Sequence, residues 1–140
     1  MTASDASLER RYVALLEAFR DRDLATVQRL VAPNVEVAVA GAGRFAGGYR
    51  GLGEVLGLIT SIQRDVVPRS GRLVRVTSDG HAVESSVVVT LRDVRGRTQE
   101  AGLVHRFEFD DDGRAVRGVI SADDQAAFDA FLPPLASERP

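Results

Sequence analysis

Apolar and polar residues alternate most regularly between residues 98 and 120 of the chain. Successive side chains on a β-strand point to opposite faces of the sheet, so this alternation predicts strands with one buried face. Asp112-Gly113 interrupts the pattern with a dipeptide that tight hairpins favour. The segment is therefore predicted to be a hairpin of two long strands with one histidine in its apolar row. That row consists of Leu103, His105, Phe107 and Phe109.

Apolar residues at helical spacing predict four helices. Two lie near the start of the chain, one lies between the second and third predicted strands, and one lies near the end. Ser7, Asp23 and Ser121 are candidate N-caps, and Pro33 prevents the second helix from continuing. The predicted helices cover residues 7–21, 23–31, 52–62 and 121–132. The predicted strands cover residues 34–40, a short segment at 44–45, and residues 73–78, 81–94, 98–109 and 114–120.

This order of elements predicts an α+β fold in a single domain, 1–140, with a folded core over about 7–132. Two of the strands exceed the usual ~5 to 6 residues, and long strands in a twisted sheet bend around what packs on their concave side. We expect a cone-shaped, curved antiparallel sheet with three to four helices on its concave face. The open end of such a cone leaves a pocket lined by the inner face of the sheet and the first helix.

Composition narrows the classes of function. The chain is 44% hydrophobic and 27% charged, it has no run long enough to span a membrane, and its N-terminus lacks the apolar core of a signal peptide. The net charge of -2 argues against nucleic acid as the main partner. The absence of cysteine excludes disulfides and thiolate chemistry and suits the cytoplasm, where we expect the protein to reside.

All 18 basic residues are arginine. One interpretation is a bias in codon usage, and most of these charges are then simply solvated. The other is a site for an anionic ligand, for which the sequence offers two clusters. These are Arg69, Arg72 and Arg75, and Arg92, Arg95 and Arg97.

The candidate chemistry centres on His105 and Tyr12. His105 lies in an apolar row, and Tyr12 lies on the buried stripe of the first helix. Each is open to a structural interpretation, as a buried polar group satisfied by a neighbour, and to a functional one, as a cavity-facing donor, acid or base. If both reach one empty space, they could hold a polarised carbonyl or phenolate there.

Other residues are predicted to line the same cavity. Ser85 shares a face with the valines of its strand and could orient a ligand, or it could simply fill the strand. Tyr49 and Phe45 flank a glycine-rich bend and could close the mouth of the pocket or seal the core. The full set of predicted ligand-binding residues is Phe19, Val39, Phe45, Tyr49, Ser85, Val87, Leu103 and Phe107. Asp123 and Asp124 are interpreted as structural, because carboxylates favour the first turn of a helix.

Three segments together resemble the nuclear transport factor 2-like superfamily, in particular its SnoaL-like and ketosteroid isomerase-like branch. They are RRYVALLEAFRDRDLATVQRLVAPNVEV near the start, GGYRGLGEV before the third helix, and HRFEFDDDGRAVRGVIS near the end. The resemblance covers residues 8–132 and implies a cystatin-like roll. It also implies a homodimer through the outer face of the sheet, where Ala82, Val88 and Val104 lie among charged residues.

The resemblance also implies roles for individual residues. Tyr12 matches the helix tyrosine that holds the oxyanion in ketosteroid isomerases, and His105 falls where their oxyanion-binding aspartic acid would be. The catalytic base has no counterpart, because the matching first-strand positions are Ala38 and Val39. Steroid-type double-bond migration by that route is therefore not expected.

The sequence thus predicts a protein that binds a small, mostly apolar molecule in a conical cavity. It is predicted to act as an isomerase, cyclase or hydratase, with Tyr12 donating a hydrogen bond to the ligand's oxygen and His105 sharing that role or moving a proton. The alternative is a non-catalytic ligand-binding or dimerisation module with a vestigial pocket. No cofactor is implied, and no dinucleotide, phosphate-loop, calcium or zinc motif is present.

Overall fold

One curved sheet and the helices packed against it make up the fold. The computed structural model describes residues 5–134, with side chains from residue 7 onward. The helices among these residues are α1 (Asp5–Asp21), α2 (Leu24–Leu30), α3 (Gly51–Arg64) and α4 (Gln125–Phe131). The strands are β1 (Val31–Val39), β2 (Gly47–Arg50), β3 (Arg72–Asp79), β4 (Ala82–Arg92), β5 (Thr98–Phe109) and β6 (Ala115–Ala122). The predicted α+β class is confirmed.

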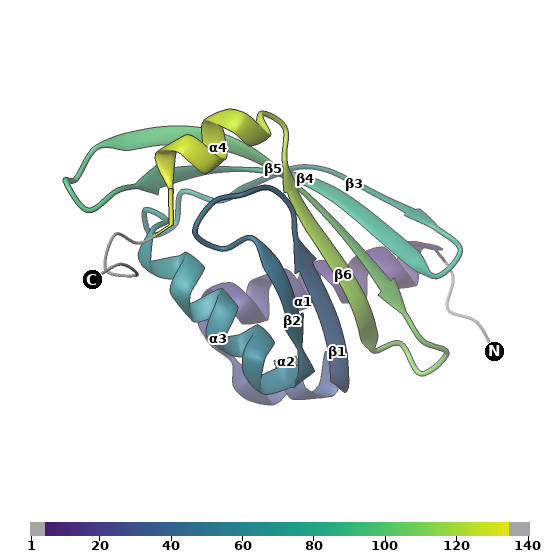
Figure 1. The fold of residues 1–140 in the computed structure, drawn as a ribbon. Helices are drawn as coiled ribbons and strands as arrows, with labels where there is room; N and C mark the ends of the chain where they lie inside the picture. The colour runs from purple at the N-terminus through teal and green to yellow at the C-terminus, as the bar shows by residue number, and fades with distance from the viewer. Residues whose placement is uncertain (1–4, 135–140) are drawn as a thin grey trace.

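The sheet has six strands in the order β2-β1-β6-β5-β4-β3 (Figure 1). It is mixed, because β1 pairs with β6 in parallel while the other neighbours pair antiparallel. The prediction of a wholly antiparallel sheet is therefore wrong at this pair. The chain leaves β2 through α3 and enters β3 at the opposite edge, and the meander of four strands then brings β6 back beside β1 in the same direction.

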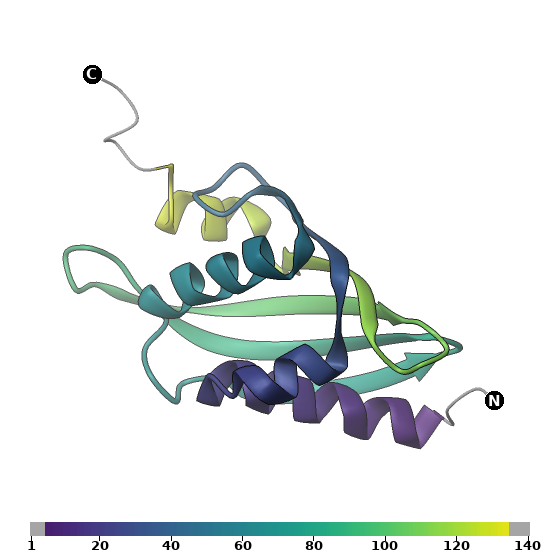
Figure 2. The same cartoon turned by 90° about the horizontal axis from the view of Figure 1, so that it is seen from below.

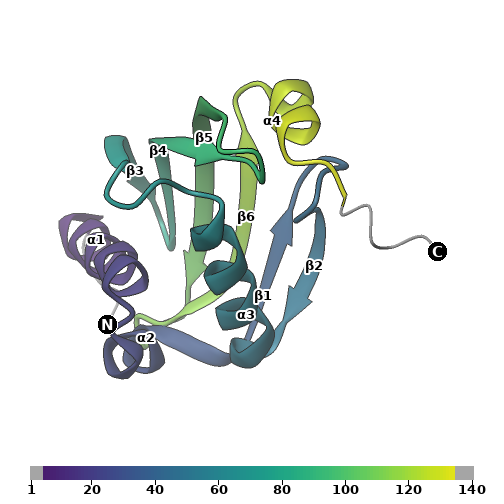
Figure 3. The same ribbon diagram turned by 90° about the vertical axis from the view of Figure 1, so that its left-hand side faces the viewer.

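The helices fill the concave side of the sheet. α1 contacts β3 and β4, whereas α3 contacts β1 and β2. Figure 3 shows both helices inside the curve of the strands, and Figure 2 shows α2 side by side with α1. α4 lies at the end of the sheet away from α2 (Figure 1). Leu8, Tyr12 and Leu15 of α1 pack with Val35, Val83 and Phe107 in one continuous apolar core.

Of the three predicted helix N-caps, two are wrong and one is confirmed. α1 begins at Asp5, so Ser7 lies within the helix and is not its N-cap. Ser121 lies in β6, and the N-cap of α4 is Asp124, whose carboxylate accepts a hydrogen bond from the backbone N–H of Ala127 at 3.1 Å. A carboxylate so placed satisfies a free amide of the first turn better than the hydroxyl of a strand residue can. The cap predicted at Asp23 is confirmed by its contact with the N–H of Thr26.

The short second strand lies at Gly47–Arg50 instead of residues 44–45. Arg44 and Phe45 form a turn, in which Phe45 is buried and the guanidinium of Arg44 contacts the carboxylate of Asp65 at 3.0 Å. These two anchors hold the turn against the core and α3, so pairing with β1 starts only two residues later.

The predicted hairpin dipeptides are confirmed. Gly80, Gly96 and Gly113 all have positive φ, between 63° and 81°, in the turns that join β3 through β6. Asp110 accepts hydrogen bonds from the backbone N–H groups of Asp112 and Arg114. No helix of the described residues is long and apolar enough to cross a membrane.

Candidate functional site

Tyr12 reaches from α1 onto the inner face of the sheet. Its side chain is completely buried, and its hydroxyl lies 2.5 Å from Oγ of Ser85 on β4. Ser85 is itself only 1% exposed and is the single polar residue in the buried core of the described chain. Ser85 was predicted to face a cavity. In the structure its hydroxyl contacts that of Tyr12.

His105 completes a chain of three polar side chains. Cross-strand pairing sets His105 of β5 opposite Ser85 of β4, so both point to the inner face. Nδ1 of His105 lies 3.4 Å from the hydroxyl of Tyr12, a long contact at the limit of a hydrogen bond. The ring is half-buried. Its second nitrogen, Nε2, has no hydrogen-bond partner among the described residues and is not fully buried. One nitrogen of the ring is thus left open.

Burial fixes the protonation states of the two aromatic side chains. Loss of hydration lowers the pKa of His105 to about 4, so its imidazole is neutral at physiological pH. Loss of hydration also raises the pKa of Tyr12 to about 12, against a smaller opposing effect of the hydrogen bond with Ser85. The site presents neutral dipoles and no charge.

The surroundings of His105 are apolar. Ile120 of β6 lies directly opposite His105, and Val39 of β1 follows Ile120 in the same row of the sheet. Phe107 packs its ring against Tyr12, with the centroids 5.9 Å apart and the planes at 46°. Ile120 was not among the predicted ligand-binding residues. The alternation of residues 114–120 could have identified it, because Gly118 and Ile120 share one face of that strand.

Five of the eight predicted ligand-binding residues fall into two groups. Val87, Leu103 and Phe107 are buried on the inner face of the two strands that carry Ser85 and His105. Phe45 and Tyr49 instead line an open groove of about 720 Å³ between the turn at residues 44–46 and α3. The hydroxyl of Tyr49 donates to the carbonyl of Phe45 at 2.7 Å, which holds this pair together.

That groove does not include Tyr12, Ser85 or His105. Its wall is formed by Arg44, Phe45, Gly48, Tyr49, Glu54, Gly57, Leu58, Ser61, Arg64 and Asp65. The structure therefore brings the polar trio together and places Phe45 and Tyr49 elsewhere.

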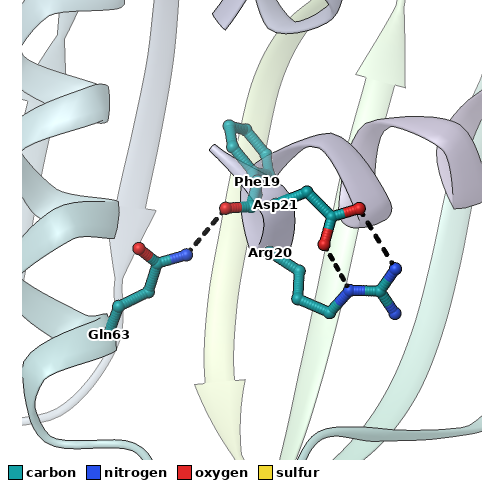
Figure 4. A network of polar contacts seen from close by, with 4 residues as sticks. All are labelled: Phe19, Arg20, Asp21 and Gln63. Carbon is teal, nitrogen blue, oxygen red and sulfur yellow. Dashed lines mark hydrogen bonds and ion pairs between the residues drawn. The ribbon is translucent and has the colours of Figure 1, made fainter. Parts of the chain in front are cut away.

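Phe19 lies where the end of α1 meets α3. Its side chain is half-buried, and its backbone carbonyl accepts a hydrogen bond from the side-chain amide of Gln63 at 2.7 Å (Figure 4). This bond ties the last turn of α1 to α3. The neighbouring pair of Arg20 and Asp21, also drawn in Figure 4, is exposed and contributes little to the position of the helix.

Comparison with known proteins gives both a family match and structural neighbours. A family model described as a SnoaL-like domain matches residues 10–118. A protein of unknown function with a cystatin-like fold from Xanthomonas campestris superposes with a TM-score of 0.76 at 20% identity, over 90% of this chain and 98% of its own. A LEH-like epoxide hydrolase from M. tuberculosis superposes with a TM-score of 0.68 at 22% identity, over 91% and 88% of the two chains.

A candidate SnoaL-like polyketide cyclase from Jannaschia sp. CCS1 gives a TM-score of 0.72 at 14% identity, over 96% of this chain and 99% of its own. At these identities the likeness establishes the fold, and one fold hosts many activities. No curated protein matches the sequence significantly.

Proposed function

This chain belongs to the SnoaL-like domain family, and on that premise we propose that it binds a small, mostly apolar molecule on the concave side of its sheet, with His105 as the polar contact. The observation that carries the proposal is the free Nε2 of His105 on an otherwise apolar face. Water can reach this atom in the free protein, but a bound apolar molecule would displace that water, and the polar atom would then cost free energy unless the ligand paired with it. A ligand oxygen meets that need.

We further propose that the bound molecule undergoes an isomerisation, cyclisation or hydration. Neutral hydrogen-bond donors in a water-poor site stabilise an oxygen that gains negative charge in the transition state. The epoxide hydrolase and the candidate cyclase share this fold, which supports an enzymatic role. In this proposal His105 contacts the ligand, while Tyr12 and Ser85 act through His105, since their hydroxyl groups are buried and bonded to each other.

A second candidate function is binding or dimerisation without catalysis. Two observations favour it. Ala38 and Val39 occupy the positions where a carboxylate base would be expected, and the hydroxyl of Tyr12 is already occupied by Ser85. Mass spectrometry of a bound compound after incubation with the protein distinguishes the two functions. A converted compound indicates catalysis, and an unchanged one indicates binding alone.

The proposed binding role predicts a ligand-dependent gain in thermal stability. In a thermal-shift screen of apolar carbonyl compounds, a ligand at 100 times its Kd is expected to stabilise the wild type by about 2.7 kcal/mol. His105→Ala is expected to lose about 1 kcal/mol of that gain, the value of one neutral hydrogen bond. The control is His81→Ala, which changes the exposed histidine in the β3–β4 turn. A gain that survives both His105→Ala and Tyr12→Phe contradicts the assigned site.

The outer face of the sheet is proposed to pair with a second copy of the chain. Val88 and Val104 are half-buried there, and Val119 on the same face is 44% exposed although it is apolar. Val104→Arg is expected to convert a dimer to a monomer in light scattering, because the long charged side chain would lose hydration between the two sheets. Val94→Arg, in the exposed β4–β5 turn, is the matched control and is expected to leave the mass unchanged. A monomeric wild type contradicts the proposal.

A further inference from the structure

The polar trio of Ser85, Tyr12 and His105 offers two directions for its hydrogen bonds, and the structure distinguishes them. In one direction Ser85 donates to Tyr12 and Tyr12 donates to Nδ1 of His105. In the other, Nδ1–H donates to Tyr12 and Tyr12 donates to Ser85. The distances, 2.5 Å between the two hydroxyl oxygens and 3.4 Å to Nδ1, suit either direction.

The hydroxyl proton of Ser85 decides between them. Ser85 is 1% exposed, and Tyr12 is its only hydrogen-bond partner among the described residues. If Tyr12 donated to Ser85, the serine proton would be buried without an acceptor, which native proteins avoid. If Ser85 donates to Tyr12, both hydroxyl protons are paired.

From this count we infer that Ser85 and Tyr12 are positioning residues that hold His105 as its Nε2–H tautomer, so that the site offers a hydrogen-bond donor and selects apolar ligands carrying an acceptor oxygen. The inference rests on the proposed function for its ligand and on the structure alone for its tautomer. A ketone, quinone or phenolate oxygen satisfies Nε2–H, whereas a ligand without an acceptor leaves it unpaired.

The same geometry argues against a role for His105 as a general base toward the ligand. The lone pair of a neutral imidazole lies on the nitrogen without the proton, here Nδ1. That nitrogen lies 3.4 Å from the hydroxyl of Tyr12, whereas Nε2 is the ring nitrogen without a partner among the described residues. The group that a ligand meets is the N–H.

The tautomer is measured first, on the ligand-free protein, by long-range ¹H–¹⁵N NMR of the histidine rings at neutral pH. The expected spectrum has a protonated, pyrrole-like Nε2 and an unprotonated, pyridine-like Nδ1 for His105. Tyr12→Phe is expected to shift the Nδ1 resonance because its donor is lost. Ser85→Ala is expected to keep the tautomer, because Tyr12 then has only His105 to donate to. A proton on Nδ1 in the wild type overturns the inference, whether or not either variant folds.

The ligand class is tested with two probes of nearly equal size, 1-tetralone, which has a ketone oxygen, and tetralin, which has none. Tetralone is expected to shift the Nε2 resonance and to bind His105→Phe about fivefold more weakly than the wild type, since one neutral hydrogen bond is lost. Tetralin is expected to leave Nε2 unmoved.

The outcomes separate the inference from the proposed function. Equal affinity for the two probes, with Nε2 unmoved by tetralone, overturns the ligand class. If neither probe binds and the Nε2–H tautomer is observed, the proposed function and the ligand class are contradicted. The inferred direction of the hydrogen bonds is then still supported. The reversed tautomer with tight tetralone binding overturns the inference and leaves the proposed function standing.

Discussion

Replacing Gly118 with alanine is expected to destabilise the protein by about 1 to 3 kcal/mol, because the added methyl group overpacks the core. Gly118 lies opposite Phe107 in the β5–β6 pair. A Cβ at this position would lie 2.5 to 2.9 Å from three carbons of the Phe107 ring. The ring cannot simply swing away, since it is 6% exposed and packs against Tyr12. The strain therefore reaches the residue that orients His105.

Gly102→Ala is the matched control for this prediction. Gly102 lies on the neighbouring strand β5, and the three atoms nearest to a Cβ there all belong to the side chain of Asp123, which is exposed and can move. Its effect is expected to stay within about 0.5 kcal/mol, as for most surface changes. Urea unfolding of the three proteins measures the differences. Equal stability of Gly118→Ala and the wild type would show that the sheet widens to admit the methyl group.

Most of the fold could be predicted from the sequence, because most of its helices, strands and turns have local sequence patterns. Asp-Gly and Arg-Gly turns with alternating flanks define the meander, and their glycines have the positive φ that these turns require. The parallel pairing of β1 with β6 joins two segments that are about 80 residues apart in the sequence. It depends on the path of the chain between them, which no local pattern encodes. The position of β2 was missed for a similar reason. Phe45 looked like a strand residue, but burial in the core and the contact of Arg44 with Asp65 hold this segment as a turn.

The candidate site was partly predictable. Alternation placed His105 and Ser85 on the inner face, and helical spacing placed Tyr12 on the buried stripe, so that proximity of the three followed from the fold. Which groups bond to which did not follow, because it depends on the register that sets Ser85 opposite His105. The prediction that Tyr12 itself donates to a ligand stays a prediction. Its complete burial favours a role through His105.

The separation of the trio from the groove beside Tyr49 was also beyond the sequence. Phe45 and Tyr49 pack in or against the core, and together with residues of α3 they line a groove that does not include the trio. The groove is lined by ion-pairing groups, among them Arg44 and Asp65, whereas the trio is surrounded by apolar side chains. The two regions therefore differ in the polar groups that they offer to a ligand, and the substrate class stays a prediction.

Acidification is expected to destabilise the protein through His105. The pKa of the ring is about 4 in the folded chain against 6.5 for an exposed histidine. Between these values the unfolded chain binds a proton that the folded chain excludes, so this contribution to stability is complete above about pH 7 and decreases as the pH falls from 6.5 toward 4. The expected loss between pH 7.5 and pH 5 is about 2 kcal/mol.

His105→Gln isolates that contribution, because glutamine remains neutral while the carboxylates that titrate in acid are unchanged. Urea unfolding at pH 7.5 and pH 5 is expected to show a smaller loss for this variant than for the wild type, by about 2 kcal/mol. His81→Gln is the control, since His81 is exposed beside Asp111 and is expected to retain the loss seen in the wild type. An equal loss in wild type and His105→Gln would mean that the ring accepts a proton in the folded protein, and the neutral donor proposed for the site would then be wrong.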